Sequence, residues 1–462
     1  MDVYGGLYRK VLMPSWERLR GRRLFETLDF LERSQWEPRK TVEAFQLMEL
    51  RRLLVHAQNH IPYYQKLFAK HGFDPYRIES VRDIECLPPL TKEIVREHRH
   101  ELVDKRTAKT HIHKATGGSS GQPFEFEYDR GSEVFRQAMK WRTYGWAGYR
   151  PGTRALHYWG MPVPLAGLNG WKIRLDRALR RELYVDCIAQ DEASLLRAVD
   201  AVRRFRPKVI VGFTLAVARL AKFIVDRRLR DWDDIAVIGG AEPLFEADRA
   251  VIKQAFGPHV FDAYGARETM LMASECELHD GLHTMDEGQL IEVVVDGRRA
   301  RPGEVGEILV TDLHNFGMPL IRYRNGDLAE VREDGPCPCG RGLGKSIARV
   351  VGRRTAQLRD AHGEPVSGLL VPALIALFRH HVEEYQVVQK ASGEVVIRVV
   401  PGPHYDANAM GEVVRRATPY FGGLPVRVEL ASRLERGPGG KHHVVIVEPP
   451  STQTDAQRVA AI

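Results

Sequence analysis

The chain lacks any long apolar run. No stretch of its 462 residues approaches the roughly 20 consecutive apolar residues that a membrane-spanning helix needs. The N-terminal segment scatters Arg9, Lys10 and Arg18 where a secretory signal peptide would carry its apolar core. We therefore expect a cytoplasmic protein with no membrane span.

Cysteine is also scarce. Five cysteines, an odd number, do not make a disulfide framework, so a reduced compartment fits the composition. Metal ligation is the other use of cysteine to consider. Cys86 and Cys187 stand apart from the others in the sequence, and we expect both to be ordinary buried residues.

The remaining cysteines suggest a metal site. Cys276 and His283 lie on one stretch, and Cys337 and Cys339 lie on another, which gives three thiolates and an imidazole. His279 is an alternative fourth ligand. A Cys-x-Cys flanked by proline and glycine forms a tight knuckle that suits tetrahedral zinc. The competing interpretation is a set of unrelated thiols and histidines.

Internal repeats and low-complexity segments are absent, and neither sign of charge dominates. The 68 Lys and Arg residues exceed the 60 Asp and Glu residues by eight, a mild excess that suits small polyanionic substrates such as nucleotides. Binding to nucleic acid or to a membrane surface is the competing explanation. The best local candidate for such binding is a group of five basic residues, which is more simply explained as a solvated helix face. This candidate comprises Lys172, Arg174, Arg177, Arg180 and Arg181.

The apolar pattern predicts a large α/β domain with a helical N-terminal layer. A chain of this length that is 44% apolar is expected to hold a large core and two or more domains. The first 110 residues are predicted to be mostly helical, with a helix that stops before Pro62. From about 150 to 330, apolar runs at 209–211 and 235–238 alternate with helical stretches such as 246–256, which indicates α/β layering.

Near Gly352 the pattern changes to that of a small α+β domain. Helices are expected at 371–378 and 408–417, and strands across 385–400, at 426–430 and at 444–447. The predicted domains are 1–352 (with the helical layer about 1–110), 353–449, and a loose tail at 450–462.

A glycine- and hydroxyl-rich stretch is the first candidate for a binding site. Residues 116–123 read Thr-Gly-Gly-Ser-Ser-Gly-Gln-Pro and offer backbone N–H groups and hydroxyl donors to an anion, which is phosphate-binding chemistry. The alternative is an ordinary surface turn, because glycine and serine mark loops for conformational reasons alone.

Three downstream segments are further candidates for parts of a binding site. Gly-Gly-Ala-Glu-Pro at 239–243 follows an apolar run, where an α/β sheet exposes backbone to ligands such as a flat base. Tyr264 is an aromatic able to cover a purine, and Glu268 is a carboxylate able to hold Mg²⁺. Asp327 ends a strand-like run and is a good acceptor for two sugar hydroxyls. Taken alone, each segment is also compatible with a structural turn or core residue.

In this order and spacing, the four segments resemble the adenylate-forming superfamily. Within it, the chain resembles the phenylacetate-CoA ligase family, and more closely its capsule-biosynthesis-type branch, over most of residues 1–450. The resemblance implies an ATP-dependent, AMP-forming ligase with a large domain and a small mobile domain. It also implies that the cysteine and histidine set binds a structural zinc.

The resemblance assigns roles to individual residues. Tyr264 and Gly265 match the purine-stacking segment, Glu268 the Mg²⁺ ligand, and Asp327 and Arg353 the ribose-binding pair. The ATP phosphate loop is matched by Thr116, Gly117, Gly118, Ser119, Ser120 and Gly121. The adenine-site turn is matched by Gly240, Ala241, Glu242 and Pro243.

The small domain carries the implied catalytic lysine. Lys441 follows Gly-Pro-Gly-Gly on a flexible loop, and its ammonium can approach the α-phosphate and carboxylate as charge builds in the transition state. The chain departs from the superfamily in two places. The phosphate loop lacks a lysine after Pro123, and Thr355 stands where the hinge usually has an acid.

The sequence therefore predicts a ligase that activates an aryl or other hydrophobic acid as an acyl-adenylate and transfers it to coenzyme A. Trp159 and Phe213 are candidate lining residues of the acid pocket, although aromatics there are as often plain core. The nearest alternative hands the acyl group to an amine or hydroxyl. The others are a non-catalytic nucleotide-binding protein and a nucleic-acid binder. A homodimer is compatible with the sequence.

Overall fold

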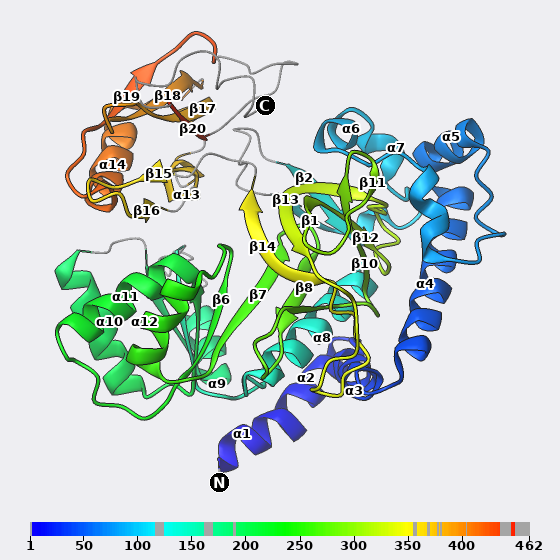
Figure 1. Ribbon diagram of the computed structural model, residues 1–462, viewed down its shortest axis with the longest axis horizontal. Coiled ribbons are helices and arrows are strands. Elements are labelled where there is room, and N and C mark those ends of the chain that lie inside the picture. Colours follow the sequence, from blue (N-terminus) through cyan, green and yellow to red (C-terminus); the bar gives the residue numbers. More distant parts are fainter. Residues whose placement is uncertain are drawn as a thin grey trace. The chain divides into compact units, whose positions relative to one another are not determined.

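The computed structural model describes residues 2–115, 124–160, 170–187, 191–353, 358–366, 370–376, 378, 381–402, 404–434 and 445–448. Its internal contacts divide the chain into two units. The large unit holds 1–114, 125–185 and 199–353, and the small unit holds 115–124, 186–198 and 354–462. Figure 1 shows the elements of both.

The N-terminal part of the large unit is helical, as predicted. Its longest helix, α4, ends where Ile61 adopts an extended backbone before Pro62, because the residue before proline disfavours helix. The elements are α1 (Val3–Leu7), the π-helical η1 (Tyr8–Leu12), α2 (Met13–Leu19), α3 (Leu24–Ser34), α4 (Arg39–His60), α5 (Pro62–His71), η2 (Val81–Cys86), α6 (Lys92–Glu97), α7 (Arg99–Leu102) and η3 (Ala108–Thr110).

A 12-stranded sheet forms the centre of the large unit, and one part of it is parallel. Strand β5 pairs in parallel with β3 and β6, and β6 pairs in parallel with β7. The strands of this part are β3 (Ala155–Trp159), β5 (Val209–Phe213), β6 (Ala236–Gly240) and β7 (Val260–Ala266), and β4 (Glu182–Asp186) lies beside β3 at the edge of the sheet. Helices α11 and α12 contact it (Figure 1). The helices of this region are α8 (Arg130–Trp146), α9 (Gly170–Arg180), α10 (Glu192–Phe205), α11 (Thr214–Asp226) and α12 (Glu246–Phe256).

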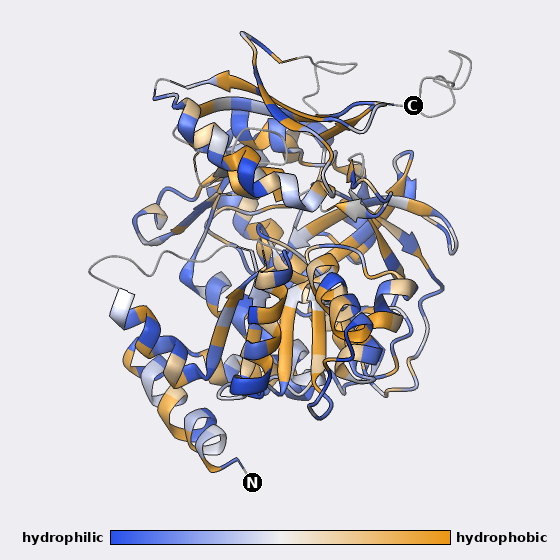
Figure 2. Ribbon diagram, turned by 90° about the vertical axis from the view of Figure 1, so that its left-hand side faces the viewer, coloured by the Kyte–Doolittle hydropathy of each residue, from blue (hydrophilic) through white to orange (hydrophobic). Residues whose placement is uncertain are grey.

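Strands β5 and β6 are apolar and largely buried because both faces of the parallel part of the sheet are covered. Val211, Ile238 and Phe261 stand in register on neighbouring strands and pack into one core with residues of α3 and α8, such as Leu31 and Met139. Figure 2 shows these strands coloured as hydrophobic along most of their length. The packing explains why β5 and β6 appear in the sequence as short continuous apolar runs.

The expected alternation of strands and helices ends at Ala266. The chain continues instead as a series of antiparallel strands, in which one face of a strand such as β13 is buried and the other is more exposed. Its strands are β8 (Met270–Glu275), β9 (Leu282–Thr284), β10 (Gln289–Val295), β11 (Arg298–Arg299), β12 (Val305–Asp312), β13 (Tyr323–Val331) and β14 (Ile347–Arg353). A separate two-stranded sheet pairs β1 (Ile112–Ala115) with β2 (Glu125–Tyr128).

The small unit contains a mixed four-stranded sheet in the order β19-β18-β17-β20. Its core joins strand residues such as Val387 and Ile397 to helix residues such as Leu374 and Val413. The elements are β15 (Leu358–Arg359), β16 (Pro365–Val366), α13 (Leu370–Ala376), β17 (Val382–Gln389), β18 (Val395–Pro401), α14 (Ala407–Ala417), η5 (Thr418–Phe421), β19 (Val426–Leu430) and β20 (Val445–Val447). The predicted mixed α/β fold with a smaller α+β part is confirmed.

The structure bears on two further sequence-based expectations, one about membrane-spanning helices and one about the isolated cysteines. Among the described residues, no helix combines the length and apolar character required to cross a bilayer. The prediction that Cys86 is buried is wrong, because Cys86 ends the short helix η2 with its side chain exposed, while Ile84 and Leu87 point into the core. Cys187 is buried as expected.

Candidate functional site

The carboxyl ends of the parallel strands bring two of the predicted segments together. Phe213 at the end of β5 is in register with Gly240 at the end of β6, and Gly240 is in register with Ala263 of β7. Tyr264 follows Ala263 directly. The glycine turn and the aromatic residue therefore lie at the same sheet edge, which is where α/β sheets bind ligands.

The turn after β6 is packed tightly against the start of α11. A Cβ on Gly239, near the end of β6, would lie 2.9 Å from the Thr214 hydroxyl oxygen, so a larger residue there would require Thr214 to shift. Ala241 has a φ of +67°, a strained backbone for a residue with a Cβ. Glu242 accepts hydrogen bonds at its carboxylate from the Leu215 N–H (3.0 Å) and at its carbonyl from the Thr214 hydroxyl (3.0 Å). Pro243 follows in the same turn. Such strain concentrates at ligand sites.

Tyr264 and Asp327 meet in one buried network, although 63 residues separate them. The Tyr264 hydroxyl donates to Asp327 Oδ2 at 2.9 Å, and Asn325 Nδ2 donates to both the Tyr264 hydroxyl (2.7 Å) and Asp327 Oδ2 (3.1 Å). The Asp327 N–H in turn donates to Asn325 Oδ1 at 3.0 Å. Asp327 also pairs with Arg353 across β13 and β14. The network fixes the aromatic ring and the carboxylate relative to each other.

Glu268 is buried in the turn between β7 and β8. Its Oε1 accepts from the Tyr323 hydroxyl at 3.0 Å and lies 3.6 Å from Lys92 Nζ. The turn is tight, because a Cβ on Gly265 would lie 2.2 Å from the carbonyl oxygen of Met270, and Met270 itself has a φ of +64°. A buried carboxylate next to an ammonium group indicates that charged groups gather at this turn.

Several predicted residues lie outside the described part of the chain. They are the phosphate loop, Thr116 to Gly121, the hinge position Thr355 and the lysine Lys441. For Arg353, the backbone pairing with Asp327 is described. Conversely, Lys92 and Asn325 were not predicted as site residues. Asn325 lies two residues before Asp327 in the same segment, whereas no sequence pattern connects Lys92 to Glu268.

Trp159 and Phe213 lie in contact at the ends of β3 and β5, with their ring centroids 4.3 Å apart. The two strands are parallel neighbours, so both side chains stand at the edge that carries the glycine turn. Both are only partly buried. They form a partly open aromatic pair beside the other candidate residues.

The four predicted metal ligands converge. The ligand atoms of Cys276, His283, Cys337 and Cys339 all lie within 4.8 Å of one another. The Cys276 and Cys337 sulfurs are 3.9 Å apart, and Cys339 Sγ is 3.4 Å from His283 Nε2. A tetrahedral zinc with Zn–S bonds of about 2.3 Å separates two sulfurs by about 3.8 Å. His279 instead contacts Glu275, at 3.1 Å.

The surroundings of the cluster favour the ligand form of His283 and of Cys337. Burial lowers the pKa of His283 to about 4, which leaves a neutral imidazole, and its Nδ1 faces the Leu343 carbonyl at 3.3 Å. Burial opposes ionisation of Cys337, but hydrogen bonds from Cys339 and Lys345 outweigh it and hold the pKa below the ordinary thiol value. Burial raises the pKa of Cys276 to about 12 in the absence of a cation. The donor set fits zinc.

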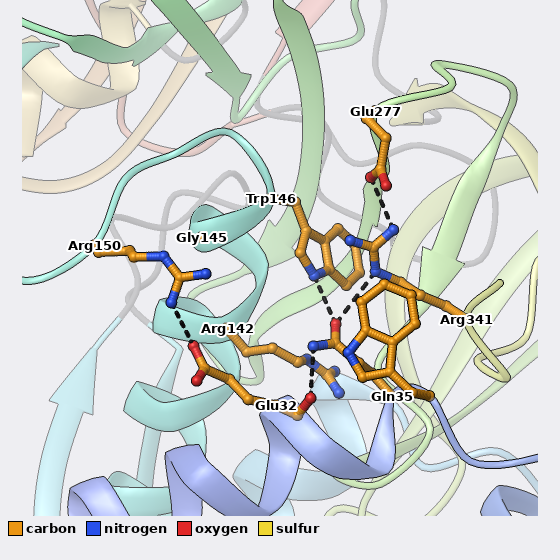
Figure 3. A pocket seen from close by; sticks show the side chains of 9 residues that line it. Glu32, Gln35, Arg142, Gly145, Trp146, Arg150, Glu277 and Arg341 are labelled. Carbon is orange, nitrogen blue, oxygen red and sulfur yellow. Dashed lines mark hydrogen bonds and ion pairs between the residues drawn. The ribbon is translucent and has the colours of Figure 1, made fainter. Parts of the chain in front are cut away.

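A clamp around Arg341 holds the two cysteine-bearing loops together. Its guanidinium donates to Glu277 (2.8 Å), which follows Cys276, and to Gln35 (3.2 Å). It lies between the rings of Trp36 and Trp146, 4.8 and 4.6 Å from their centroids. Figure 3 shows these side chains around a pocket of about 280 Å³. Each arginine that lines the pocket is paired with an acid. The pocket therefore has little unpaired charge, and its side chains serve to hold the two cysteine-bearing segments together.

Several known proteins resemble this chain in sequence or in fold. No family model matches the chain. The chain is 27% identical over 369 residues to a phenylacetate-coenzyme A ligase of Thermus thermophilus (77% of this chain, 80% of that protein). It is 24% identical to the protein CapK of Staphylococcus aureus (83% and 84%). A crystal structure of 2-hydroxyisobutyryl-CoA ligase in the postadenylation state superposes with a TM-score of 0.59 over 93% of this chain and 94% of that one, at 20% identity.

The chain has the fold of an adenylate-forming ligase. The resemblance inferred from its motifs is also confirmed, because its curated relatives are phenylacetate-CoA ligases and CapK. In this adenylate-forming fold, the segments of the candidate site come from β6, β7 and β13, with β14 alongside.

Asn325 provides a test of the network in this adenylate-forming fold. Asn325→Ala removes three hydrogen bonds that orient Tyr264 and Asp327, each worth roughly 1 kcal/mol. We expect the KM for ATP to rise at least about tenfold with a smaller change in kcat. Asn59→Ala is the control, because Asn59 is exposed and its side chain accepts a hydrogen bond from the exposed Tyr76 hydroxyl, away from this network. An unchanged KM for ATP in Asn325→Ala would contradict the proposed role.

Proposed function

We propose that the chain is an ATP-dependent, AMP-forming acid–CoA ligase. A substrate carboxylate attacks the α-phosphate of ATP and pyrophosphate leaves. The thiol of coenzyme A then attacks the acyl carbon of the acyl-adenylate, a thioester forms and AMP leaves. The observation that best supports this is the buried network of Tyr264, Asn325 and Asp327 at the carboxyl edge of the sheet. Its relatives named phenylacetate-CoA ligase support the same reaction.

Within this proposal, the Tyr264 ring covers the adenine and the Gly240 turn lies beside it. Asp327 accepts hydrogen bonds from the ribose hydroxyls, and Arg353, its backbone partner across β13 and β14, donates to the ribose. Residues 116–121 bind the phosphates. Glu268 holds Mg²⁺, which neutralises charge on the pyrophosphate as it leaves. Lys92, 3.6 Å from Glu268, adds a cation near this point in a chain whose phosphate loop lacks the usual lysine.

The proposed substrate is an aryl or other hydrophobic acid. Trp159 and Phe213 are partly buried aromatic neighbours at the strand ends, and such a pair presents an apolar surface to a ligand. We also propose that zinc fills the Cys276–His283–Cys337–Cys339 cluster as a structural ion. Five free cysteines fit a reducing, cytoplasmic location.

We retain the predicted division between a large domain, 1–352, and a small mobile domain that carries Lys441. Lys441→Ala is expected to lower the rate of adenylation by a factor on the order of 10² or more and to leave ATP binding largely intact. Pyrophosphate release and ATP binding are measured in parallel. Lys390→Ala is the control, since Lys390 pairs with Glu448 in the small unit. Unchanged pyrophosphate release in Lys441→Ala would refute the assignment.

The experiment that tests the whole reaction is product identification by mass. The protein is incubated with ATP and Mg²⁺ over a panel of aryl and fatty acids, with and without coenzyme A. Acyl-CoA formation supports the proposal. Bound acyl-adenylate without thioester would favour an amine or hydroxyl acceptor instead, an alternative that the similarity to CapK keeps open. No product with any acid would favour a non-catalytic nucleotide-binding protein.

A further inference from the structure

The N-terminal helical segment exposes an apolar stripe. Its buried residues include Tyr8 and Met13, five apart, and the Met13 N–H donates to the Tyr8 carbonyl as in a π-helix. This wider turn keeps α1 and α2 packed by one face across 17 residues, with Gly5 and Glu17 buried at either end. The apolar residues on the remaining surface are between 42% and 82% exposed. They are Val3, Leu7, Val11, Leu12, Trp16 and Leu19.

Helix α9 is exposed in the same way. Of its 11 residues, Gly170 is the buried one. Trp171, Leu175 and Leu179 are spaced four apart, so they form a stripe along one side, and they are 62%, 51% and 45% exposed. Single exposed apolar residues are common, but aligned tryptophan and leucine side chains mark an interaction surface.

The two stripes belong to one region of the large unit. The Tyr4 hydroxyl of α1 donates to the Leu179 carbonyl of α9 at 2.7 Å. Arg181, just past α9, pairs with Asp2 at 2.7 Å and lies 4.6 Å from the Tyr4 ring centroid. Figure 2 shows the N-terminal helices at the lower left. We call residues 2–20 and 170–181 together the basic apolar face.

This face carries most of the net charge of the chain. Its nine Lys and Arg residues against three Asp and Glu residues give +6, of a formal +8 for the whole sequence. Asp2 and Asp176 are already paired with Arg181 and Arg180, and Glu17 is buried. The basic residues are Arg9, Lys10, Arg18, Arg20, Lys172, Arg174, Arg177, Arg180 and Arg181.

We propose that the basic apolar face binds the surface of a bilayer that contains anionic lipid. Tryptophan and leucine side chains enter the boundary between headgroups and acyl chains, and the lysines and arginines contact the anionic headgroups. A second copy of the chain fits less well, because a symmetric contact would bring two faces of charge +6 together. Nucleic acid would complement the positive charge of this face but would leave the exposed tryptophan and leucine stripes without an apolar partner. The inference does not rest on the proposed ligase activity.

Vesicle flotation tests whether the basic apolar face binds an anionic bilayer. The full chain is mixed with vesicles of phosphatidylcholine alone, or with about 30% phosphatidylglycerol, at about 50 mM salt, where charges are weakly screened. We expect binding to the anionic vesicles that weakens at least tenfold when salt is raised, and little binding to phosphatidylcholine alone. Neither ATP nor substrate acid is needed for this binding.

Two variants separate the apolar and basic contributions. Leu175→Ser, at a residue 51% exposed, is expected to weaken vesicle binding about tenfold, and Leu430→Ser, at a residue 55% exposed in the small unit, is expected to leave it unchanged. Lys172→Glu is expected to weaken it at least about tenfold, because each basic residue near the surface contributes roughly fivefold. Lys222→Glu, an exposed lysine of α11, is the matched control.

Three results would overturn the inference. One is no binding to the anionic vesicles at low salt. Another is an equal loss in Leu175→Ser and Leu430→Ser, which would show that the apolar stripe has no specific part. The third is binding to DNA or RNA, or self-association, that depends on Leu175 and Lys172 while vesicle binding does not.

Discussion

Replacing Glu268 with Gln is expected to slow acid-dependent pyrophosphate release by a factor of about 10² or more. Glu268 is 2% exposed and its carboxylate lies between the Tyr323 hydroxyl and the Lys92 ammonium. The amide of Gln has the same shape but no charge, so its affinity for Mg²⁺ falls while the surrounding turn is preserved. The release rate is measured as a function of Mg²⁺ concentration.

The Mg²⁺ dependence distinguishes this role from a purely structural one. In Glu268→Gln, half-maximal activity should require a higher Mg²⁺ concentration. Tyr323→Phe, which removes one hydrogen bond to the same oxygen, should give a smaller loss with a nearly unchanged Mg²⁺ requirement. If Glu268→Gln lost activity with an unchanged Mg²⁺ requirement, the assignment of Glu268 as the metal ligand would be wrong.

Replacing Cys337 with Ser is expected to remove bound zinc and to lower the free energy of unfolding by at least about 2 kcal/mol. The four ligand atoms lie within 4.8 Å of one another, and they come from the segment that follows β8 and includes β9 and from the loop between β13 and β14, which the Arg341 clamp joins. A bound ion stabilises the folded state because the unfolded chain does not hold the ligands together. Wild-type protein purified without chelator should contain about one zinc per chain by elemental analysis.

Cys86→Ser is the matched control for this change. Cys86 is exposed and lies outside the cluster, so its replacement should alter neither the zinc content nor the midpoint of denaturant unfolding. Absence of zinc from the wild-type protein, or equal behaviour of Cys337→Ser and Cys86→Ser, would remove the proposed zinc site.

The fold was predictable where one local pattern decided it. Helix 246–256 was predicted with the bounds that α12 has, because the apolar period of a helix and Gly257 at its end agree. The antiparallel arrangement of the strands from Met270 to Arg353 was not predicted. Its pairings, for example Asp327 with Arg353, join segments far apart in the sequence, and no local pattern encodes which strands become neighbours.

The candidate site shows the same division. The resemblance supplied Tyr264 and Asp327 as separate residues, but not the hydrogen bond between them, because it depends on how β7 and β13 are placed by the strands between them. Spacing alone left His279 and His283 open as the fourth metal ligand, and the backbone places His283 in the cluster. The salt link from Lys92 to Glu268 joins α6 to the β7–β8 turn and has no sequence signature.

The central claim is acid-dependent adenylation, and acid-dependent exchange of labelled pyrophosphate into ATP measures that step directly, without coenzyme A or any other acceptor. We predict that label enters ATP in the presence of Mg²⁺ and a hydrophobic carboxylic acid, and that none enters without the acid. Tight ATP binding without exchange for any acid in an aryl and fatty acid panel would contradict the proposed function.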